Sequence, residues 1–340
     1  MPASHESRES HKGFGIPKAD EANKLRAIES QVRNWVQVAT GLKLRETTSI
    51  ESRVMHVSQS VPWQLKIAAK LVLARIPLSY RFWKKAGLFN LGGMERPEYA
   101  LSVFRRHFDA ANFARKRGNF VGLELGPGDS LFSALIARTF GASRTYLVDI
   151  GPFMCPDVTF YRHMEFHLRE MGLQPPSLAN CSTLNDVIST CSAEYLTEGL
   201  GSLRKLPSGS VDFVWSHAVL QHVRRSEFLP TLLELRRIQC SEGVGSHCVS
   251  ISDILGGKLN DLRFSRRIWE SSLMANSGFY TNRLRYGELL RLFRVAGFDP
   301  KLRCVARWQK LPTPRRRMAQ EFAMLPEEEL RVSGFDVLLR

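Results

Sequence analysis

Hydrophobic and polar positions divide the chain into a helical first part and an alternating second part. Up to about residue 115, hydrophobic residues recur at helical spacing over 23–37, after Pro62 and from Pro97 to Phe108. From Phe120 onwards, short hydrophobic runs typical of buried parallel strands alternate with amphipathic stretches. Strands are predicted at 120–125, 145–150, 193–197, 211–216 and 248–254, helices at 131–140, 156–192, 220–238 and 286–296, and a final antiparallel pair at 301–308 and 335–339. This alternation predicts an α/β protein with an open, mostly parallel sheet.

Three segments follow from this division. Residues 1–22 are polar and are predicted to form a flexible tail, 23–115 a helical cap for substrate recognition, and 116–340 the α/β domain. The tail has no hydrophobic centre, which excludes an ordinary signal peptide. No run approaches 18 apolar residues, because charges and Pro77 interrupt the best candidate at 67–78. The six cysteines lack CxxC spacing and are typical of free thiols in a reducing compartment, so we expect a cytoplasmic protein.

Charge is distributed unevenly along the 340 residues, whose formal net charge is +15. The first 120 residues carry 21 basic and 10 acidic side chains, residues 121–220 carry 6 and 10, and the remainder carries 21 and 13. Basic flanks could attract phosphate-bearing ligands or nucleic acid, although scattered arginines also simply solvate helices. Because no long Lys/Arg run with interleaved aromatic residues occurs, nucleic-acid binding is permitted but not indicated.

The most informative motif is a glycine turn between a predicted strand and a predicted helix. Gly126 and Gly128 follow the run at 120–125 and let the backbone bend and pass close to a ligand. Asp149 closes the next predicted strand, 21 residues after Gly128. Because the carboxyl ends of parallel strands form the ligand crevice, this carboxylate is placed to accept hydrogen bonds from a ribose diol. Both NAD and S-adenosylmethionine carry that diol.

The residues around the turn separate these two ligands. A dinucleotide fingerprint needs a third glycine three positions after the second, where this chain has Leu131. Glu124 would repel a pyrophosphate but suits the ammonium group of a methionine moiety. We therefore favour S-adenosylmethionine, with a nucleotide or a turn without any ligand as the alternatives.

Together these motifs resemble the class I S-adenosylmethionine-dependent methyltransferases over about 118–340. The resemblance rests on ELGPGDS (124–130), on VD (148–149) and on LPSGSVDFVWSHAVLQHV (206–223). SGFYTNRLRYGELLRLFRVAGF (277–298) is similar to a bacterial subgroup whose N-terminal helical segment resembles GLFNLGGMERPEYALSVFRRH (87–107). The fold implied is a Rossmann-like, seven-stranded, mostly parallel sheet whose last strand is antiparallel, with an N-terminal helical appendage.

The resemblance also implies roles for particular residues. Residues of the turn would surround the methionine part of S-adenosylmethionine: Glu124, Gly126, Pro127, Gly128 and Ser130, where Ser130 replaces the family's third glycine. Asp149 would bind the ribose hydroxyls and Ile150 would pack on adenine. The family's acidic residue after the third strand has two candidate matches, Glu194 and Glu198, of which Glu198 is included in the predicted cofactor site. Ser216 and His217 would line the floor at the end of the fourth strand.

Candidate catalytic residues are His217, His222 and Asp253. A base helps when a hydroxyl must lose its proton before it attacks the methyl group. His217 could act as this base or could instead form part of the wall of the cofactor pocket. For His222, a local role in capping or packing is favoured over a role as the base. Asp253, predicted to end the fifth strand, either orients a substrate hydroxyl or caps the next turn.

Other residues suggest weaker roles. Arg283 or Arg285 could bind an acidic acceptor, but both arginines are expected to be exposed to solvent without such a role. Met94 and Tyr99 could form a lid, although packing is the simpler role. No His/Asp/Glu trio has metal-site spacing, so the transfer is expected to be independent of metal.

Three functions remain open at this point. The favoured one is methyl transfer to a small-molecule, glycan-linked or lipid-linked acceptor, at a hydroxyl, by in-line displacement. The second is methylation of RNA or protein through the basic flanks. Against amino-group methylation of bases, the turn after the fourth strand reads SHAV (216–219) and not Asn-Pro-Pro-Tyr. The third is a non-catalytic binding module that keeps the cofactor fold.

Overall fold

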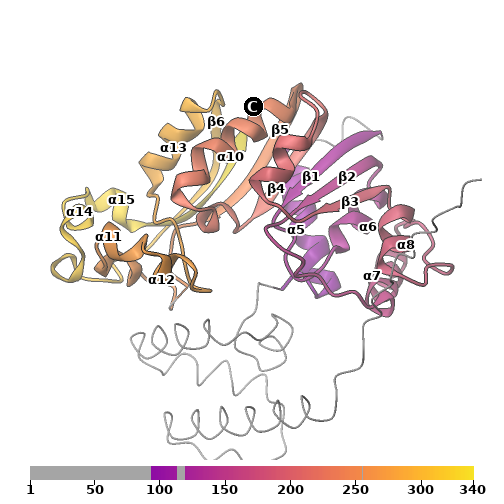
Figure 1. Cartoon of the computed structure of the whole chain (residues 1–340), viewed down its shortest axis with the longest axis horizontal. Helices are drawn as coiled ribbons and strands as arrows, with labels where there is room; N and C mark the ends of the chain where they lie inside the picture. Colours follow the sequence, from indigo (N-terminus) through magenta and orange to yellow (C-terminus); the bar gives the residue numbers. More distant parts are fainter. Residues whose placement is uncertain (1–92, 113–118, 255) are drawn as a thin grey trace, which may run out of the picture. The chain divides into compact units, whose positions relative to one another are not determined.

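The computed structural model describes residues 93–112, 119–254 and 256–340 (Figure 1). The predicted tail, the helix at 23–37 and the helix after Pro62 lie outside the described residues. The strands are β1 (Phe120–Leu125), β2 (Ala142–Val148), β3 (Ala193–Leu196), β4 (Val211–His217), β5 (Gln239–Ser250), β6 (Pro300–Arg307) and β7 (Val332–Leu339). The longer helices are α5 (Pro97–Ala110), α6 (Phe132–Thr139), α7 (Val158–Glu170), α10 (Arg225–Ile238) and α13 (Tyr286–Val295). The shorter ones are α8 (Leu184–Thr190), α9 (Leu200–Lys205), α11 (Arg266–Trp269), α12 (Ser272–Ala275), α14 (Gln320–Ala323) and α15 (Glu327–Arg331).

The seven strands form one sheet in the order β3-β2-β1-β4-β5-β7-β6. The first five strands in this order pair in parallel, whereas β7 is antiparallel to both β5 and β6. This confirms the predicted fold class, including the antiparallel last strand. The order reverses between β1 and β4, and the carboxyl ends of strands at such a switch point form the ligand-binding edge of an open α/β sheet.

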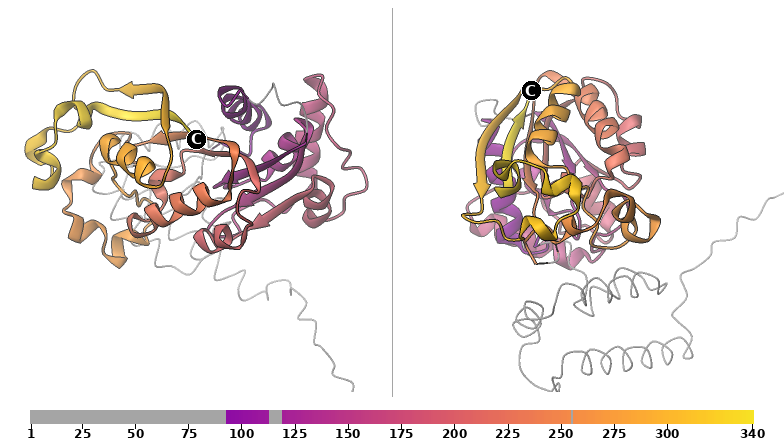
Figure 2. Two further views of the ribbon diagram at one scale, coloured as in Figure 1. Left: turned by 90° about the horizontal axis from the view of Figure 1, so that it is seen from above. Right: turned by 90° about the vertical axis from the view of Figure 1, so that its left-hand side faces the viewer.

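Helices cover both faces of the sheet, because parallel strands are hydrophobic on both sides. One core joins α5, α6 and α7 to the sheet and includes the rings of Phe104, Phe213 and Trp215. The ring of Phe104 on α5 meets that of Trp215 edge to face, with the ring centroids 5.3 Å apart. The second core lies under α10 and α13 and includes Phe228 and Phe293. The helix at Pro97–Ala110 is therefore packed on the sheet as part of its first core (Figure 2).

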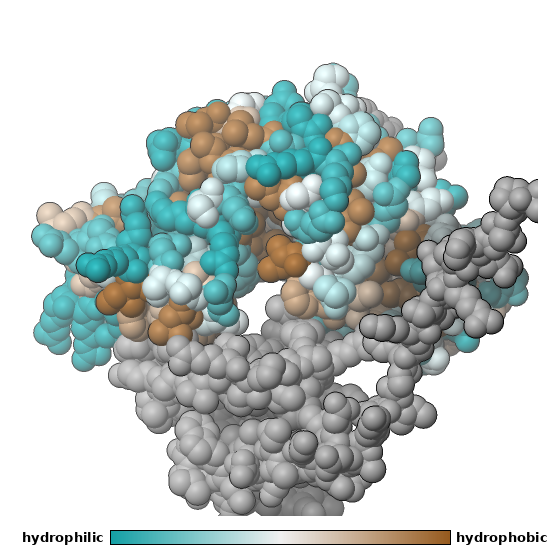
Figure 3. Space-filling model, in the orientation of Figure 1, coloured by the Kyte–Doolittle hydropathy of each residue, from teal (hydrophilic) through white to brown (hydrophobic). Residues whose placement is uncertain are grey.

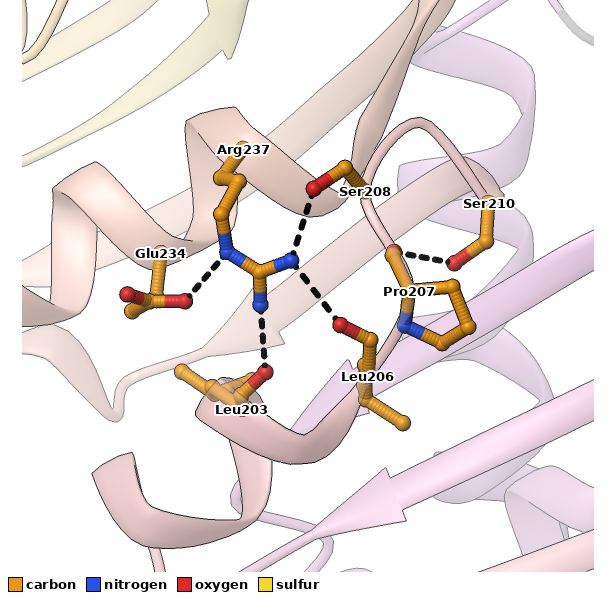
Figure 4. A network of polar contacts seen from close by, with 7 residues as sticks. All are labelled: Leu203, Leu206, Pro207, Ser208, Ser210, Glu234 and Arg237. Carbon is orange, nitrogen blue, oxygen red and sulfur yellow. Dashed lines mark hydrogen bonds and ion pairs between the residues drawn. The ribbon is translucent and has the colours of Figure 1, made fainter.

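An arginine on α10 fixes the segment that leads into β4. The guanidinium of Arg237 donates to the backbone oxygens of Leu203 and Leu206, at 3.0 and 2.9 Å, and to the hydroxyl of Ser208 (Figure 4). Its Nε atom also donates to Glu234 on the same helix, at 2.7 Å. These bonds join α9 and the following turn to α10, and so set where β4 begins.

Residues 251–254, 256–285 and 308–331 pack together and form what we call the accessory lobe, which contains the helices α11, α12, α14 and α15 (Figure 1). Its small core contains Leu262 from the first segment and Phe322 from the second. The Ala319 amide donates to the Leu262 oxygen at 2.8 Å, so backbone bonds also join the two segments. The lobe follows β5, and α15 leads into β7, so it lies at the edge of the sheet where β5 ends and the antiparallel β7 begins.

Two arginines of the accessory lobe, which the sequence predicts to be exposed to solvent, are buried. Arg283 and Arg285 are each 4% exposed. Arg283 donates to the Phe264 oxygen at 2.6 Å and lies over the ring of Trp269. Arg285 donates to four backbone oxygens, those of Ile251, Glu329, Leu330 and Val332. The expectation of solvated arginines is wrong because long-range backbone carbonyls, invisible in the local sequence, supply their partners.

The predicted limits of β5 differ most from the observed ones. The strand begins at Gln239 and ends at Ser250, whereas the prediction was 248–254. Polar residues and two glycines in its first half hide the hydrophobic pattern, although Val244 to Cys248 pair with β4. As a result Asp253 lies beyond the strand, in a turn, and does not end it. The predicted helix at 220–238 is a 3-10 turn, Leu220–His222, followed by α10.

Within the described part of the chain, no helix is long and apolar enough to cross a membrane. On the face drawn in Figure 3, hydrophobic side chains form separate patches between hydrophilic ones. Single exposed hydrophobic residues such as Val295, which is 54% exposed, are ordinary for a protein surface.

Candidate functional site

The predicted glycine turn joins β1 to the segment before α6. Gly126 and Gly128 have φ angles of +74° and +69°, a region that favours glycine. A Cβ atom on Gly126 would lie 2.5 Å from a methyl carbon of Val219, so no larger residue fits there. The Gly126 amide donates to the Val148 oxygen at 2.8 Å, which ties the turn to the end of β2. The ends of β1, β2 and β4 therefore meet at this turn.

Asp149 was predicted to close the second strand at 145–150; the structure places it directly after β2, with its carboxylate facing the turn. One oxygen accepts from the Gly128 amide at 3.0 Å, and the other accepts from the Ile150 amide at 2.7 Å. Burial raises the pKa of Asp149, while these two amides counteract part of the shift. Each carboxylate oxygen retains a second acceptor position, as a ribose diol requires. Next to it, the hydrophobic side chain of Ile150 is 80% exposed.

Glu124 is a buried carboxylate on β1, only 2% exposed. Burial raises its pKa to about 7, although the nearby polar groups of Ser133 and Trp215 oppose the shift. Its Oε2 atom has no hydrogen-bond partner among the described residues. A buried carboxylate oxygen without a partner is costly unless a cation or a donor pairs with it, so this atom is a candidate for contact with a cationic group.

The remaining predicted cofactor residues occupy different environments. Pro127 and Ser130 are buried, and the Ser130 hydroxyl donates to the Met94 oxygen at 2.5 Å. Glu198 follows β3 and forms an exposed ion pair with Lys205 at 2.7 Å. The alternative, Glu194, lies within β3 and pairs with Arg144. Glu198 therefore remains the candidate for the adenine contact.

His217 is the last residue of β4 and is partly buried. It is followed by Ala218, whose φ of +55° is unusual for a residue with a side chain. Such strained backbone concentrates at functional sites. The neighbouring Ser216 points to the opposite face of the sheet, where its hydroxyl shares a hydrogen bond of 2.8 Å with Nδ1 of His247. His217 is thus the residue of this pair that lies on the α5 side.

The other two predicted catalytic residues make their polar contacts elsewhere. Nδ1 of His222 is 3.0 Å from the Tyr280 oxygen, in agreement with a local packing role. Asp253 accepts from the Asn260 amide at 2.5 Å, and its own amide donates to the Lys258 oxygen. This is the geometry of a carboxylate that caps a turn. Among the described residues, no group of three or more His, Cys, Asp or Glu side chains could hold a metal ion.

No functional role was predicted for His107 and Ser246, which form a hydrogen-bonded line with His217. His107 lies on the hydrophobic face of α5, and its Nε2 atom is 3.2 Å from Nδ1 of His217. Its other ring nitrogen is 2.9 Å from the hydroxyl of Ser246 on β5. The signal in the sequence was a histidine at a core position of an amphipathic helix, but its partners lie 110 and 139 residues away.

No protein-family model and no curated protein sequence matches this chain. Among solved structures, the chain is similar to an S-adenosylmethionine-dependent methyltransferase from Archaeoglobus fulgidus, with 12% identity over 72% of this chain and 94% of that one and a TM-score of 0.39. Another similar structure is a methyltransferase from Methanosarcina mazei, with 18% identity, 65% and 92% coverage and a TM-score of 0.37. A third is an arsenic(III) S-adenosylmethionine methyltransferase from Chlamydomonas reinhardtii, with 15% identity, 66% and 64% coverage and a TM-score of 0.37. Because these TM-scores lie below 0.5, the fold assignment rests on the strand order of the sheet, which is that of the class I methyltransferase fold.

Proposed function

We propose that this chain transfers a methyl group from S-adenosylmethionine to a hydroxyl group of a small-molecule, glycan-linked or lipid-linked acceptor. The observation that carries this proposal is the arrangement of Asp149 and Ile150 at the glycine turn. A carboxylate with free acceptor positions lies beside an exposed hydrophobic side chain, at the switch point of the sheet. A nucleoside presents a matching ribose diol and a flat apolar base.

The residues at the turn fit the rest of the donor as well. The orphaned Oε2 atom of Glu124 suits the ammonium group of the methionine moiety, which would supply the missing partner. Asp149 holds the ribose hydroxyls and Ile150 packs against adenine. A pyrophosphate would instead meet the carboxyl groups of the buried Glu124 and the partly buried Asp149, which offer it no cation, and this favours a cationic donor over a dinucleotide.

When bound, S-adenosylmethionine supplies a methyl group that its sulfonium already activates. The chain therefore contributes mainly alignment, at reacting distances of about 3–3.5 Å. His217 is the candidate base, because its Nδ1 atom is occupied by His107 while no partner of its Nε2 atom is found among the described residues. That Nε2 atom accepts the proton of the acceptor hydroxyl as the oxygen attacks the methyl carbon. Burial lowers the pKa of His217, which keeps the ring neutral and able to accept a proton at pH 7.

The acceptor is bound by the accessory lobe and the turn after β4, which lie at the same strand ends. Arg283 and Arg285 do not bind it, since both donate to backbone carbonyls inside the protein. Asp253 has a turn-capping contact and has no part in the transfer. An acidic acceptor would need other cations from this edge.

Calorimetric titration with S-adenosylmethionine tests the proposal through Asp149. The purified chain should bind the donor, and Asp149→Asn should weaken binding by about tenfold or more, because it removes a charged acceptor from the ribose diol. The matched control is Asp299→Asn, which changes an exposed carboxylate whose nearest cation, Lys301, is 3.8 Å away. The control should bind like the unmodified chain.

The titration distinguishes the competing functions. If the unmodified chain gives no heat of binding, it is a non-catalytic module and the proposal is wrong. If Asp149→Asn binds as tightly as Asp299→Asn, the donor does not lie at the glycine turn. Steep salt dependence of binding to a mixed RNA sample would favour RNA as the acceptor.

A further inference from the structure

A continuous hydrogen-bonded line of three side chains crosses from β4 to α5 and on to β5. Nδ1 of His217 lies 3.2 Å from Nε2 of His107, and Nδ1 of His107 lies 2.9 Å from the Ser246 hydroxyl. The two imidazole rings are nearly perpendicular, at 79°, with their centroids 5.5 Å apart. His107 and Ser246 are 2% and 4% exposed, so packing holds both partners in place.

Each bond in this line carries one proton, so the tautomers of the two histidines are coupled. If Nδ1 of His217 donates to His107, then Nε2 of His107 is bare and its Nδ1 donates to Ser246. In that arrangement Nε2 of His217 is also bare and can accept a proton. In the reverse arrangement, Ser246 donates to His107 and Nε2 of His217 carries a hydrogen. Only the first arrangement leaves His217 able to act as a base.

The line ends beside a cleft that has a volume of about 390 Å³ and lies between α5 and the strands β5, β6 and β7. Both His107 and Ser246 line it, whereas His217 does not. Its charged side chains come from three elements: Arg106 and Asp109 from α5, Arg303 from β6 and Asp336 from β7.

We propose that His107 is a positioning residue that fixes the base tautomer of His217. This rests on the proposed function. The acceptor oxygen forms a bond to the methyl carbon, and the electron pair of the broken carbon–sulfur bond stays on sulfur. The hydroxyl proton goes to Nε2 of His217, while the Nδ1 proton of His217 stays in its hydrogen bond to His107. The proton on Nε2 leaves to solvent after the products have left, which returns His217 to its first tautomer.

The electrostatic surroundings favour release of the proton. The ionisable and charged groups that face the two rings are Tyr99 and Arg106 from α5, His247 and Cys248 from β5, and Asp336 from β7. Burial is the main cause that lowers the pKa of His107 well below its usual range, followed by the charges of His217, His247 and Arg106. The charge of Asp336 raises the pKa of His217, but Asp336 is itself paired with Arg106 at 2.5 Å. Neither ring therefore retains the proton at pH 7.

The test is nitrogen NMR of the full chain labelled with ¹⁵N-histidine, recorded with saturating S-adenosylhomocysteine. We expect Nδ1 of His217 to be protonated and Nε2 to be bare. His107→Leu should move the proton to Nε2 in a large fraction of molecules, because leucine offers no acceptor. His107→Gln should restore the original tautomer, since its amide oxygen accepts in the same place.

Two results would overturn the proposal: His217 protonated at Nε2 in the unmodified chain, or a tautomer that His107→Leu leaves unchanged. If His107→Leu does not fold, the spectrum of the unmodified chain and that of His107→Gln still decide. If S-adenosylmethionine does not bind in the donor titration described above, the proposed function is wrong. Spectra of the free chain would then decide the tautomer separately.

Discussion

The two sides of the candidate site are built in different ways. The proposed donor side, at the ends of β1 and β2, consists of backbone amides, two glycines and two carboxylates that lie within about 25 residues of each other. The side next to it, at the ends of β4 and β5, consists of side chains that meet across long distances in the sequence. His217 meets His107 over 110 residues, and Arg285 reaches Val332 over 47.

This difference separates what is general from what is specific to this chain. In the proposed function, the backbone-built turn binds S-adenosylmethionine, which is the same donor for every acceptor. In the same proposal, the side-chain-built half, which includes the accessory lobe, binds the acceptor and takes up its proton. Substitutions in the lobe should therefore lower the free energy of unfolding, whereas substitutions in the turn should weaken binding of the donor.

Replacement of Arg285 by leucine should give the largest loss of stability. Four backbone oxygens would lose their donor inside the protein, and the free energy of unfolding should fall by about 3–5 kcal/mol. Arg237→Leu is the matched control, because that guanidinium also makes four hydrogen bonds but its side chain is 33% exposed. Water can replace its bonds, so about 1 kcal/mol is expected. Urea unfolding of both variants checks this, and equal losses would contradict the buried role of Arg285.

The buried Glu124 should make stability depend on pH. Its pKa rises from 4.5 to about 7 on folding, so the folded chain keeps a proton that the unfolded chain releases. The stability that Glu124 contributes is therefore fully present below pH 4.5 and is lost as the pH rises through 7, by on the order of 3 kcal/mol. Glu124→Gln should remove this component. Urea unfolding at pH 5 and at pH 7.5 measures it, and the same pH dependence in both proteins would show that Glu124 is already ionised when free of donor.

The smallest effect is expected at the start of α8, which precedes β3 in the chain. The Thr183 hydroxyl accepts from the Asp186 amide at 3.2 Å, and the Asp186 carboxylate accepts from the Thr183 amide at 2.8 Å. Thr183→Ala should lower the free energy of unfolding by about 1 kcal/mol and leave donor affinity unchanged. Ser189→Ala, on the exposed side of the same helix, should change stability by less than about 0.5 kcal/mol. A loss of donor affinity in Thr183→Ala would mean that α8 helps to shape the donor side.

The same contrast explains which features could be predicted from sequence. The limits of β1 and the positions of the glycine turn and Asp149 follow from local patterns, because a strand, a turn and a carboxylate are encoded by adjacent residues. The burial of Arg285 and the contact between His107 and His217 could not be predicted, since their partners lie on other elements. The start of β5 was missed because its glycines and polar residues do not alternate as a strand pattern requires, although β4 and β7 pair with them.

A crystal structure of the chain grown with S-adenosylhomocysteine tests the central claim most directly. Electron density for the ribose hydroxyls should lie within hydrogen-bonding distance of the Asp149 carboxylate, with adenine against Ile150 and the amino group near Glu124. Density for the ligand at any other position, or a glycine turn that stays without ligand density at saturating concentration, would contradict the account.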